Sequence, residues 1–356
     1  MRAAKPSHRL QVAERTSQAF EALAGPLRRE LKVHCYRMLG SLHEAEDAVQ
    51  ETYLRAWRSF AKFDGRGSFR AWLYRIATNA CLDAIASRKH EQRILPDERA
   101  SATTEMPDGT PATDVMWLEP YPDSELEGIA DEAPNPEARY TSRQSVQLAF
   151  VAVIQKLPPR QRAVLLLRDV LGWSAAEVAT LLGGSIASVN SALQRSRETL
   201  AKSYGGEPAP MSHAPPDAAQ QELLGRYLRA WERLDLDSFV STLKEDATYT
   251  MPPLPQWYAG RAAIRTFFEW AWKLYDGFLL VHIAANRQPA FAAYSRSNAD
   301  EPWTAHSIQL LSLERNGIAR LTLFTKPDGP ALFGAFGLPL TLSDAARAEL
   351  MARPSS

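Results

Sequence analysis

Residues 173–202, WSAAEVATLLGGSIASVNSALQRSRETLAK, contain two helical patterns separated by a glycine turn. Ser174 is placed to cap the first helix, and Gly183-Gly184 supplies the left-handed backbone that ends it. The buried side of the second helix is predicted by apolar residues at spacings of three, four and seven: Ile186, Val189, Leu193 and Leu200. The stretch therefore predicts a helix-turn-helix.

The remaining side chains of the second helix are polar and are expected to face outward. They are Ser188, Asn190, Ser191, Gln194, Arg195 and Arg197. At about 1.5 Å per residue the helix is roughly 25 Å long, enough to lie along the major groove of DNA. Hydroxyl and amide groups can reach base edges or phosphates, and arginines can bind phosphates or guanines. The alternative is a helical hairpin with a solvated polar face.

Composition places the chain among globular proteins of two or three domains, with 356 residues of which 45% are hydrophobic. No run of about 18 apolar residues predicts a membrane span, and residues 1–6 carry no apolar core of a secretory signal. Cys35 and Cys81 lack metal-ligand spacing and are interpreted as buried thiols in a reducing cytoplasm. Neither a metal nor a cofactor is predicted.

The formal net charge of zero conceals a strong segregation of charge along the chain. Residues 1–95 carry 17 Lys/Arg against 10 Asp/Glu, residues 96–137 carry 1 against 12, and residues 138–205 carry 9 against 3. Two basic modules suit a polyanionic partner such as nucleic acid. The acidic segment between them either lies in a groove that otherwise holds nucleic acid or stays solvated as a disordered linker.

The chain is expected to be multidomain, with two all-α modules followed by an α+β domain. The predicted boundaries are a helical module at 15–95, an acidic linker at 96–137, a helical module at 138–205, a linker at 206–216 and an α+β domain at 217–343. In the last domain, helical patterns at 217–234 and 261–273 precede strand patterns at 278–284, 303–313 and 318–325. Arg315-Asn316-Gly317 predicts a hairpin turn.

Both helical modules contain motifs that resemble extracytoplasmic-function sigma factors. LPPRQRAVLLLR (157–168), followed by GWSAAEVA (172–179), resembles region 4, which reads the −35 promoter element. YRMLGS (36–41), EAEDAVQETYLRAW (44–57) and SFRAWLYRIATN (68–79) resemble region 2, which opens the −10 element. The resemblance covers residues 20–204 and implies core RNA polymerase and promoter DNA as partners. The acidic segment is similar to the connector that threads toward the polymerase cleft, although it is longer than a minimal connector.

The resemblance also implies roles for individual residues. A polar helix face suited to polymerase is formed by Asp47, Gln50, Glu51 and Arg55, with a solvated face as the alternative. Contacts to the −10 region are expected from Arg70, Trp72, Arg75, Asn79, Asp83 and Arg88. Phe69, Trp72 and Ile76 also follow a helical stripe that favours core packing. Many family members carry a lysine and an arginine where this chain has Asn190 and Ala192, which shifts discrimination onto the hydroxyl and amide side chains.

The C-terminal motifs resemble SnoaL-like polyketide cyclases and ketosteroid isomerases. They are YLRAW (227–231), LDSF (236–239), EDATYTMPP (245–253) and YAGRAAI (258–264). The resemblance implies a cone-shaped domain around an apolar pocket, with Asp246, Tyr249, Trp257 and His306 as candidate pocket residues. Catalysis, sensing of a small ligand and regulation through contact with the sigma modules or the polymerase are all open. Regulation is favoured, because no paired acid and base stands out.

The leading hypothesis is a cytoplasmic sigma factor that is not an enzyme, binds no membrane and is modulated by its fused C-terminal domain. One alternative is a helix-turn-helix repressor that senses a ligand and needs no polymerase. Another is a SnoaL-like isomerase with a nucleic-acid-binding extension, which would lose turnover on substitution of Asp246 or His306.

Overall fold

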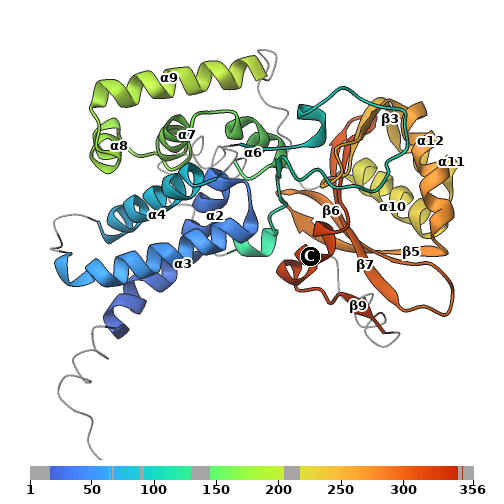
Figure 1. Ribbon diagram of the computed structural model, residues 1–356, viewed down its shortest axis with the longest axis horizontal. Helices are drawn as coiled ribbons and strands as arrows, with labels where there is room; N and C mark the ends of the chain where they lie inside the picture. The colour runs from blue at the N-terminus through green and yellow to red at the C-terminus, as the bar shows by residue number, and fades with distance from the viewer. Residues whose placement is uncertain are drawn as a thin grey trace, which may run out of the picture. The chain divides into compact units, whose positions relative to one another are not determined.

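The computed structural model describes residues 17–63, 65, 68–88, 92–127, 129, 145–203, 217–343 and 347. The chain forms two compact units. The helical unit comprises residues 1–91, 125–146 and 153–209, and the sheet unit comprises residues 92–124, 147–152 and 210–356. Figure 1 shows their elements in sequence colours.

The first half of the helical unit consists of α2 (Arg28–Leu39), α3 (Leu42–Ser59) and α4 (Phe69–Ala86). α2 ends at Gly40, whose φ of 70° lies in the left-handed region that glycine adopts without strain. The Ser41 hydroxyl then accepts a hydrogen bond from the Glu44 amide and caps α3. Cys35 and Cys81 are free, buried thiols, and their mutual hydrogen bond together with burial raises the pKa of Cys35.

The second half of the helical unit contains the predicted helix-turn-helix. α7 (Pro159–Leu165) and a π-helical turn (Leu166–Val170) precede α8 (Ala175–Leu182) and α9 (Ile186–Ser203). The preceding helix α6 (Leu148–Gln155) begins in the segment 147–152 of the sheet unit and ends in the helical unit. Ser174 and Glu177 cap α8 reciprocally through backbone and side-chain bonds of 2.7 and 3.2 Å, and these bonds lower the pKa of Glu177. Gly183 ends α8 with a φ of 63°. Both caps are confirmed as predicted.

One buried cation connects the two halves of the helical unit. Arg162 is fully buried, and its guanidinium donates to the Gln155 side chain at 2.7 Å. It also donates to four backbone carbonyl oxygens, those of Met38, Ile154, Gln155 and Leu157. Because Met38 lies in the last turn of α2, this residue ties α2 to the loop between α6 and α7. Tyr74 of α4 also packs edge-on against Trp173, with ring centroids 5.4 Å apart.

The sheet unit is built on a sheet whose strands run in the order β4-β3-β8-β7-β6-β5. Their bounds are β3 Leu243–Thr250, β4 Trp257–Ala259, β5 Gly277–Ala285, β6 Gln288–Arg296, β7 Trp303–Glu314 and β8 Gly317–Phe324, with β9 Thr341–Leu342 paired to β7. β3 and β8 are parallel and the other neighbours antiparallel. Helices α10 (Ala218–Glu232), α11 (Leu236–Ser241) and α12 (Arg261–Ala271) lie against the sheet (Figure 1), and α13 (Asp328–Leu332) follows β8.

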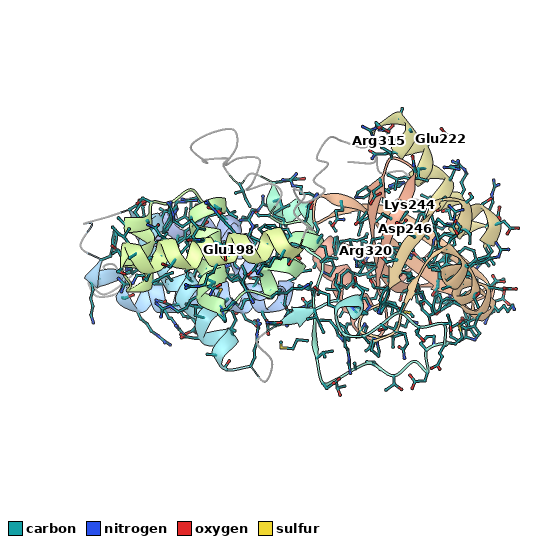
Figure 2. The ribbon with its side chains drawn as sticks, turned by 90° about the horizontal axis from the view of Figure 1, so that it is seen from above. Glu198, Glu222, Lys244, Asp246, Arg315 and Arg320 are labelled. Atoms are coloured by element: carbon teal, nitrogen blue, oxygen red, sulfur yellow. The ribbon has the colours of Figure 1, made fainter. Side chains whose placement is uncertain are left out.

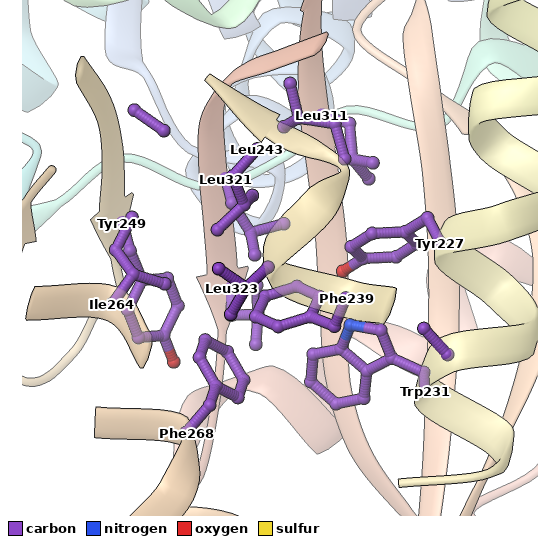
Figure 3. Packing of buried hydrophobic residues seen from close by; sticks show 14 of the residues in the cluster. Tyr227, Trp231, Phe239, Leu243, Tyr249, Ile264, Phe268, Leu311, Leu321 and Leu323 are labelled. Atoms are coloured by element: carbon purple, nitrogen blue, oxygen red, sulfur yellow. The ribbon is translucent and has the colours of Figure 1, made fainter. Parts of the chain in front are cut away.

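Aromatic side chains fill the space between these helices and the sheet (Figure 3). Trp231, Phe239 and Phe268 pack together, with Phe239 and Phe268 ring centroids 4.5 Å apart. Tyr227 is fully buried and donates its hydroxyl proton to Gln309 Oε1 at 2.7 Å. Burial raises the pKa of Tyr227. The space between the helices and the sheet is therefore a packed aromatic core that also contains buried polar groups.

Residues 92–124 belong to the sheet unit and are referred to here as the strap. Strap residues form β1 (Arg93–Ile94) and β2 (Met116–Trp117), which pair in parallel. Trp257 Nε1 donates to the carbonyl oxygen of Ala100 at 2.7 Å, and the Tyr258 hydroxyl donates to that of Glu105 at 2.7 Å. In Figure 1 the strap is the teal segment beside β3 and α12.

Side chains anchor both ends and the middle of the strap. Arg320 of β8 pairs with Asp97 at 2.6 Å, and Met106 packs against the aromatic core. The buried Tyr121 donates its amide to Asn286 Oδ1 at 2.8 Å. The expected acidic linker thus differs from a solvated tether in its first two-thirds, because backbone and side-chain bonds fix it to the sheet unit. Its residues 130–137 and the expected linker at 206–216 lie outside the described residues.

We expect the stability of the protein to fall on acidification from pH 7 to pH 5. Burial, with a smaller contribution from Lys326, lowers the pKa of His306 to about 3 from an ordinary 6.5. Its ring nitrogens contact the hydroxyls of Ser307 and Tyr275. Between pH 6.5 and 3 the unfolded chain binds a proton at His306 that the folded chain does not bind. The contribution of His306 to the free energy of unfolding is therefore complete above pH 6.5 and is lost as the pH falls. Between pH 7 and pH 5 the loss is about 2 kcal/mol.

Urea unfolding of the full chain at the two pH values, monitored by hydrogen exchange of β7 peptides, measures this dependence. A His306→Gln variant is the control and should show a weaker pH dependence of β7 protection. Equal slopes for variant and wild type would contradict the assignment to His306.

Candidate nucleic-acid interface

The outward side of α9 carries the residues predicted to contact DNA. Asn190, Ser191, Gln194 and Arg195 are exposed, and Gln194 Nε2 donates to Glu198 Oε1 at 3.0 Å. Glu198 projects from α9 in Figure 2. A hollow of about 560 Å³ lies along this helix and is lined by Arg168, Asn190, Leu193, Gln194, Arg197, Glu198 and Ala201. α9 therefore presents amide groups beside a concave, partly apolar surface.

Two predicted DNA-binding residues of α9 are engaged within the protein. The Ser188 hydroxyl accepts from the Ser185 amide at 3.1 Å and donates to the Ser185 carbonyl at 2.7 Å, so it closes the turn before α9. Arg197 forms a two-bond ion pair with Asp169, at 2.9 and 2.7 Å, which raises the pKa of Arg197. Such bidentate pairs fix the orientation of the guanidinium.

The prediction that Ile186 lies in the buried stripe of α9 is wrong. Its exposed fraction is 52%, whereas those of Val189 and Leu193 are 3% and 6%. The physical reason is position: Ile186 is the first residue of α9, where α8 and the turn do not reach over it. Sequence periodicity could not detect this, because an apolar residue in helical register predicts burial wherever it occurs.

The predicted polymerase-binding face of α3 is exposed at Asp47 and Gln50. Glu51 and Arg55 are half-buried, and Arg55 bridges Glu51 and Asp83 of α4 at 2.6 Å each, which raises the pKa of Arg55. The exposed fraction of Leu54, on the same helix, is 51% and that of Trp57 is 41%. Sequence reasoning missed this pair, although apolar residues within a polar helix face were the available signal.

The predicted −10 residues of α4 divide into two groups. Arg75 and Asn79 are exposed. Arg70 pairs with Glu30 at 2.9 Å and lies over the Tyr74 ring, and Arg88 pairs with Glu44. Trp72 is half-buried among Phe63 and Phe69, as the helical stripe suggested. The exposed groups available on α4 are therefore fewer than the sequence suggested.

The four candidate pocket residues of the sheet unit have different surroundings. Asp246 is exposed and pairs with Lys244 at 3.4 Å (Figure 2), whereas Tyr249 is buried in the aromatic core. Trp257 contacts the strap, and His306 is buried against Tyr275. None of these interactions joins one candidate to another. Within the described ranges, no three His, Cys, Asp or Glu side chains gather as a metal site.

Family comparisons match three successive segments of the chain. The Sigma-70 region 2 family matches residues 23–91, the Sigma-70 region 4 family residues 147–200, and the SnoaL-like domain family residues 224–321. The ECF RNA polymerase sigma factor SigG of Mycobacterium tuberculosis is 42% identical over 327 residues, which cover 91% of this chain and 85% of SigG. The chain belongs to the ECF RNA polymerase sigma factors.

Other ECF sigma factors match over shorter segments or at lower sequence identity. SigJ of M. tuberculosis is 32% identical over 231 residues, 65% of this chain and 63% of SigJ. The crystal structure of SigJ superposes with a TM-score of 0.55 at 23% identity, covering 91% of this chain and 99% of that structure. The likeness shows that the two chains share a fold. The SnoaL-like resemblance and the two sigma regions expected from the sequence are confirmed.

In ECF sigma-factor terms, α2, α3 and α4 lie within region 2, and α7, α8 and α9 lie within region 4. The segment between the two matches, residues 92–146, includes the strap. Among the described residues, no helix combines the length and apolar composition that a bilayer crossing requires.

Proposed function

We propose that this ECF sigma factor directs core RNA polymerase to its promoters from the cytoplasm, without catalysing a reaction itself. Region 2 would bind polymerase through α3 and the −10 DNA through α4, and region 4 would bind the −35 element through α9. Two exposed surfaces support this proposal. The polar face of α9 supplies groups that can contact DNA, and the surface of α3 around Leu54 and Trp57 supplies an apolar contact for a protein.

The α3 surface has the composition of a protein-binding site. Leu54 and Trp57 give an apolar centre, and Asp47, Gln50 and Arg58 give an exposed polar rim. Protein interfaces concentrate their binding energy in such central apolar and aromatic residues. The α4 surface offers Arg75 and Asn79 for the DNA backbone or unpaired bases.

The sheet unit is proposed to regulate transcription. A catalytic role is disfavoured because packed aromatic rings fill its interior and its candidate acid and base, Asp246 and His306, lie in unrelated surroundings. Burial favours a neutral His306 at pH 7, and its ring nitrogens are already bound to hydroxyl groups. The observation that carries the regulatory proposal is the attachment of the strap.

The strap lies in the part of the chain that corresponds to the connector between regions 2 and 4. In the family this connector threads toward the polymerase cleft, so bonds from the strap to Trp257, Tyr258 and Arg320 compete with that path. This connector is longer than a minimal one, and we infer that the additional residues let it reach Trp257, Tyr258 and Arg320. We propose that the strap-bound state is inactive and that release of the strap permits initiation.

A charge exchange at the Asp97–Arg320 ion pair tests the regulatory proposal. Arg320→Asp places two carboxylates together and should release the strap, raising promoter-directed transcription by roughly fivefold for a shift of about 1 kcal/mol. The Asp97→Arg/Arg320→Asp double variant restores the opposite charges and should return transcription to the wild-type level. Run-off transcription with purified core polymerase, using the full chain, measures both.

The matched control is Lys244→Asp, which breaks the Lys244–Glu314 pair elsewhere on the same sheet and should leave transcription unchanged. Equal transcription by wild type and Arg320→Asp would contradict regulation by the strap. Failure of the wild-type chain to support any promoter-directed transcription, while binding duplex DNA alone, would favour a repressor. Deletion of residues 217–356 is a poorer test, because it also removes Asn286, whose side chain binds the backbone of Tyr121 in the strap.

A further inference from the structure

Three exposed side chains form one row along α9. Ile186, Asn190 and Gln194 follow one another at intervals of four residues, so they lie on one side of the helix about 6 Å apart. Base pairs of B-DNA rise about 3.4 Å each, so successive members of the row match every second base pair. These three residues are referred to as the recognition row.

Two arginines beside the recognition row are held by the protein. Arg197 is held by Asp169, and Arg168 donates to the Trp173 carbonyl oxygen. The exposed Arg195 projects about 100° around the helix from Gln194, its nearest neighbour in the row, and about 180° from Ile186, so it lies on another side of α9. A bidentate arginine or lysine is the commonest reader of guanine, and the row itself contains neither. Its chemistry does not suit a G·C pair.

The amide groups of the row suit adenine. Asn and Gln side chains bind the N6 and N7 atoms of adenine with one donor and one acceptor. Gln194 donates one N–H of its side-chain amide to Glu198 Oε1 at 3.0 Å. This bond orients the amide and leaves its carbonyl oxygen and second N–H available to a base. Asn190 is exposed and borders the same hollow.

Ile186 adds an apolar group at the end of the row where recognition helices reach base edges. The first turn of such a helix enters the major groove, and the thymine methyl group is the one apolar group that a base presents there. With an exposed fraction of 52%, Ile186 has surface available for that contact. When an aliphatic side chain packs against a methyl group, apolar surface of both groups is removed from water.

We propose that the recognition row makes region 4 specific for A·T pairs, with Ile186 contacting the methyl group of a thymine and Asn190 and Gln194 reading adenines. This inference rests on the proposed function, since it names the bases read by the same helix. It concerns base identity, which neither the family match nor the fold determines.

The experiment selects duplexes with holoenzyme assembled from core polymerase and the full chain. Two pools with a randomised upstream element are prepared, one containing thymine and one containing uracil, which lacks only the 5-methyl group. Wild-type holoenzyme should enrich A·T pairs from the thymine pool, including a thymine at one fixed position. Ile186→Ala should reduce the thymine preference there by about fourfold and leave the adenine positions unchanged. In the uracil pool, wild type and Ile186→Ala should give the same preferences.

Further variants separate base reading from other effects. Gln194→Glu should change one preferred adenine to cytosine, because a carboxylate accepts from cytosine N4. Leu340→Ala, an exposed apolar residue of the sheet unit, is the matched control and should change no preference. Retention of the full thymine preference by Ile186→Ala overturns the inference, as does enrichment of G·C pairs by wild type. Weakened holoenzyme assembly with unchanged base preferences would assign Ile186 to polymerase instead. If the wild-type holoenzyme enriches no sequence, the proposed function itself fails.

Discussion

Replacing Arg162 with methionine is expected to lower the free energy of unfolding of the helical unit by at least about 3 kcal/mol. The guanidinium is fully buried and binds the Gln155 side chain and four carbonyl oxygens. Methionine fills similar volume but donates nothing, so these acceptors are left buried without a donor. Each such loss costs about 1–3 kcal/mol.

The location of Arg162 gives the loss a specific consequence. Gln155 Nε2 also donates to the carbonyl oxygen of Arg37, so this cluster holds the last turn of α2 against the region between α6 and α7. In Arg162→Met we therefore expect region 2 and region 4 to separate before either unfolds. Faster hydrogen exchange in α2 and α7, together with a lower urea midpoint, would show this in the full chain.

Arg160→Met is the matched control for this prediction. Arg160 lies two residues away, and its exposed guanidinium donates to one carbonyl oxygen, that of Leu182. Its replacement should cost about 1 kcal/mol or less. A loss for Arg162→Met no larger than that for Arg160→Met would contradict the structural role assigned to the buried guanidinium.

Replacing Leu54 with aspartate is expected to weaken binding to core RNA polymerase by at least about 30-fold. Leu54 lies at the centre of the exposed α3 surface beside Trp57, where truncation of a hot-spot residue typically costs about 2 kcal/mol or more. A charge at that point must also be desolvated on binding. Because the side chain is already half in solvent, the free chain should remain folded.

Fluorescence anisotropy of the labelled chain titrated with core polymerase measures the dissociation constant. Leu340→Asp is the control, since Leu340 has a comparable exposed fraction of 57% and lies in the sheet unit. Its binding should match wild type. If both variants bind as tightly as wild type, the α3 surface is not the polymerase contact.

Local signals in the sequence were sufficient for the helix-turn-helix and the hairpin. Ser174, Gly183 and Gly317 act within a few residues of themselves, through caps and left-handed backbone, so their effects are visible in the sequence alone. The strands at β5, β7 and β8 alternate or are continuously apolar and were predicted. β6 was missed because its alanines give weak alternation, and β3 because polar Lys244, Glu245 and Asp246 interrupt its pattern.

The candidate site was predictable as a set of positions on helices, but the pairing of its charges was not. Arg70, Arg88 and Arg197 have partners 28 to 44 residues away along the chain, at Glu30, Glu44 and Asp169. A sequence gives no distance between such residues. The exposure of Ile186 and Leu54 depends likewise on which neighbouring helices cover them.

The sequence by itself determined the family, the order of the three modules and the helix-turn-helix with its polar outward face, because motifs and helical periods are local properties of the chain. Only the tertiary structure decided that the acidic connector is bound to the sheet unit. The bonds of that segment join residues such as Asp97 and Arg320, or Tyr121 and Asn286, which are more than 150 positions apart. Charge and proline content predict that such a segment is polar and irregular, but not which surface it contacts.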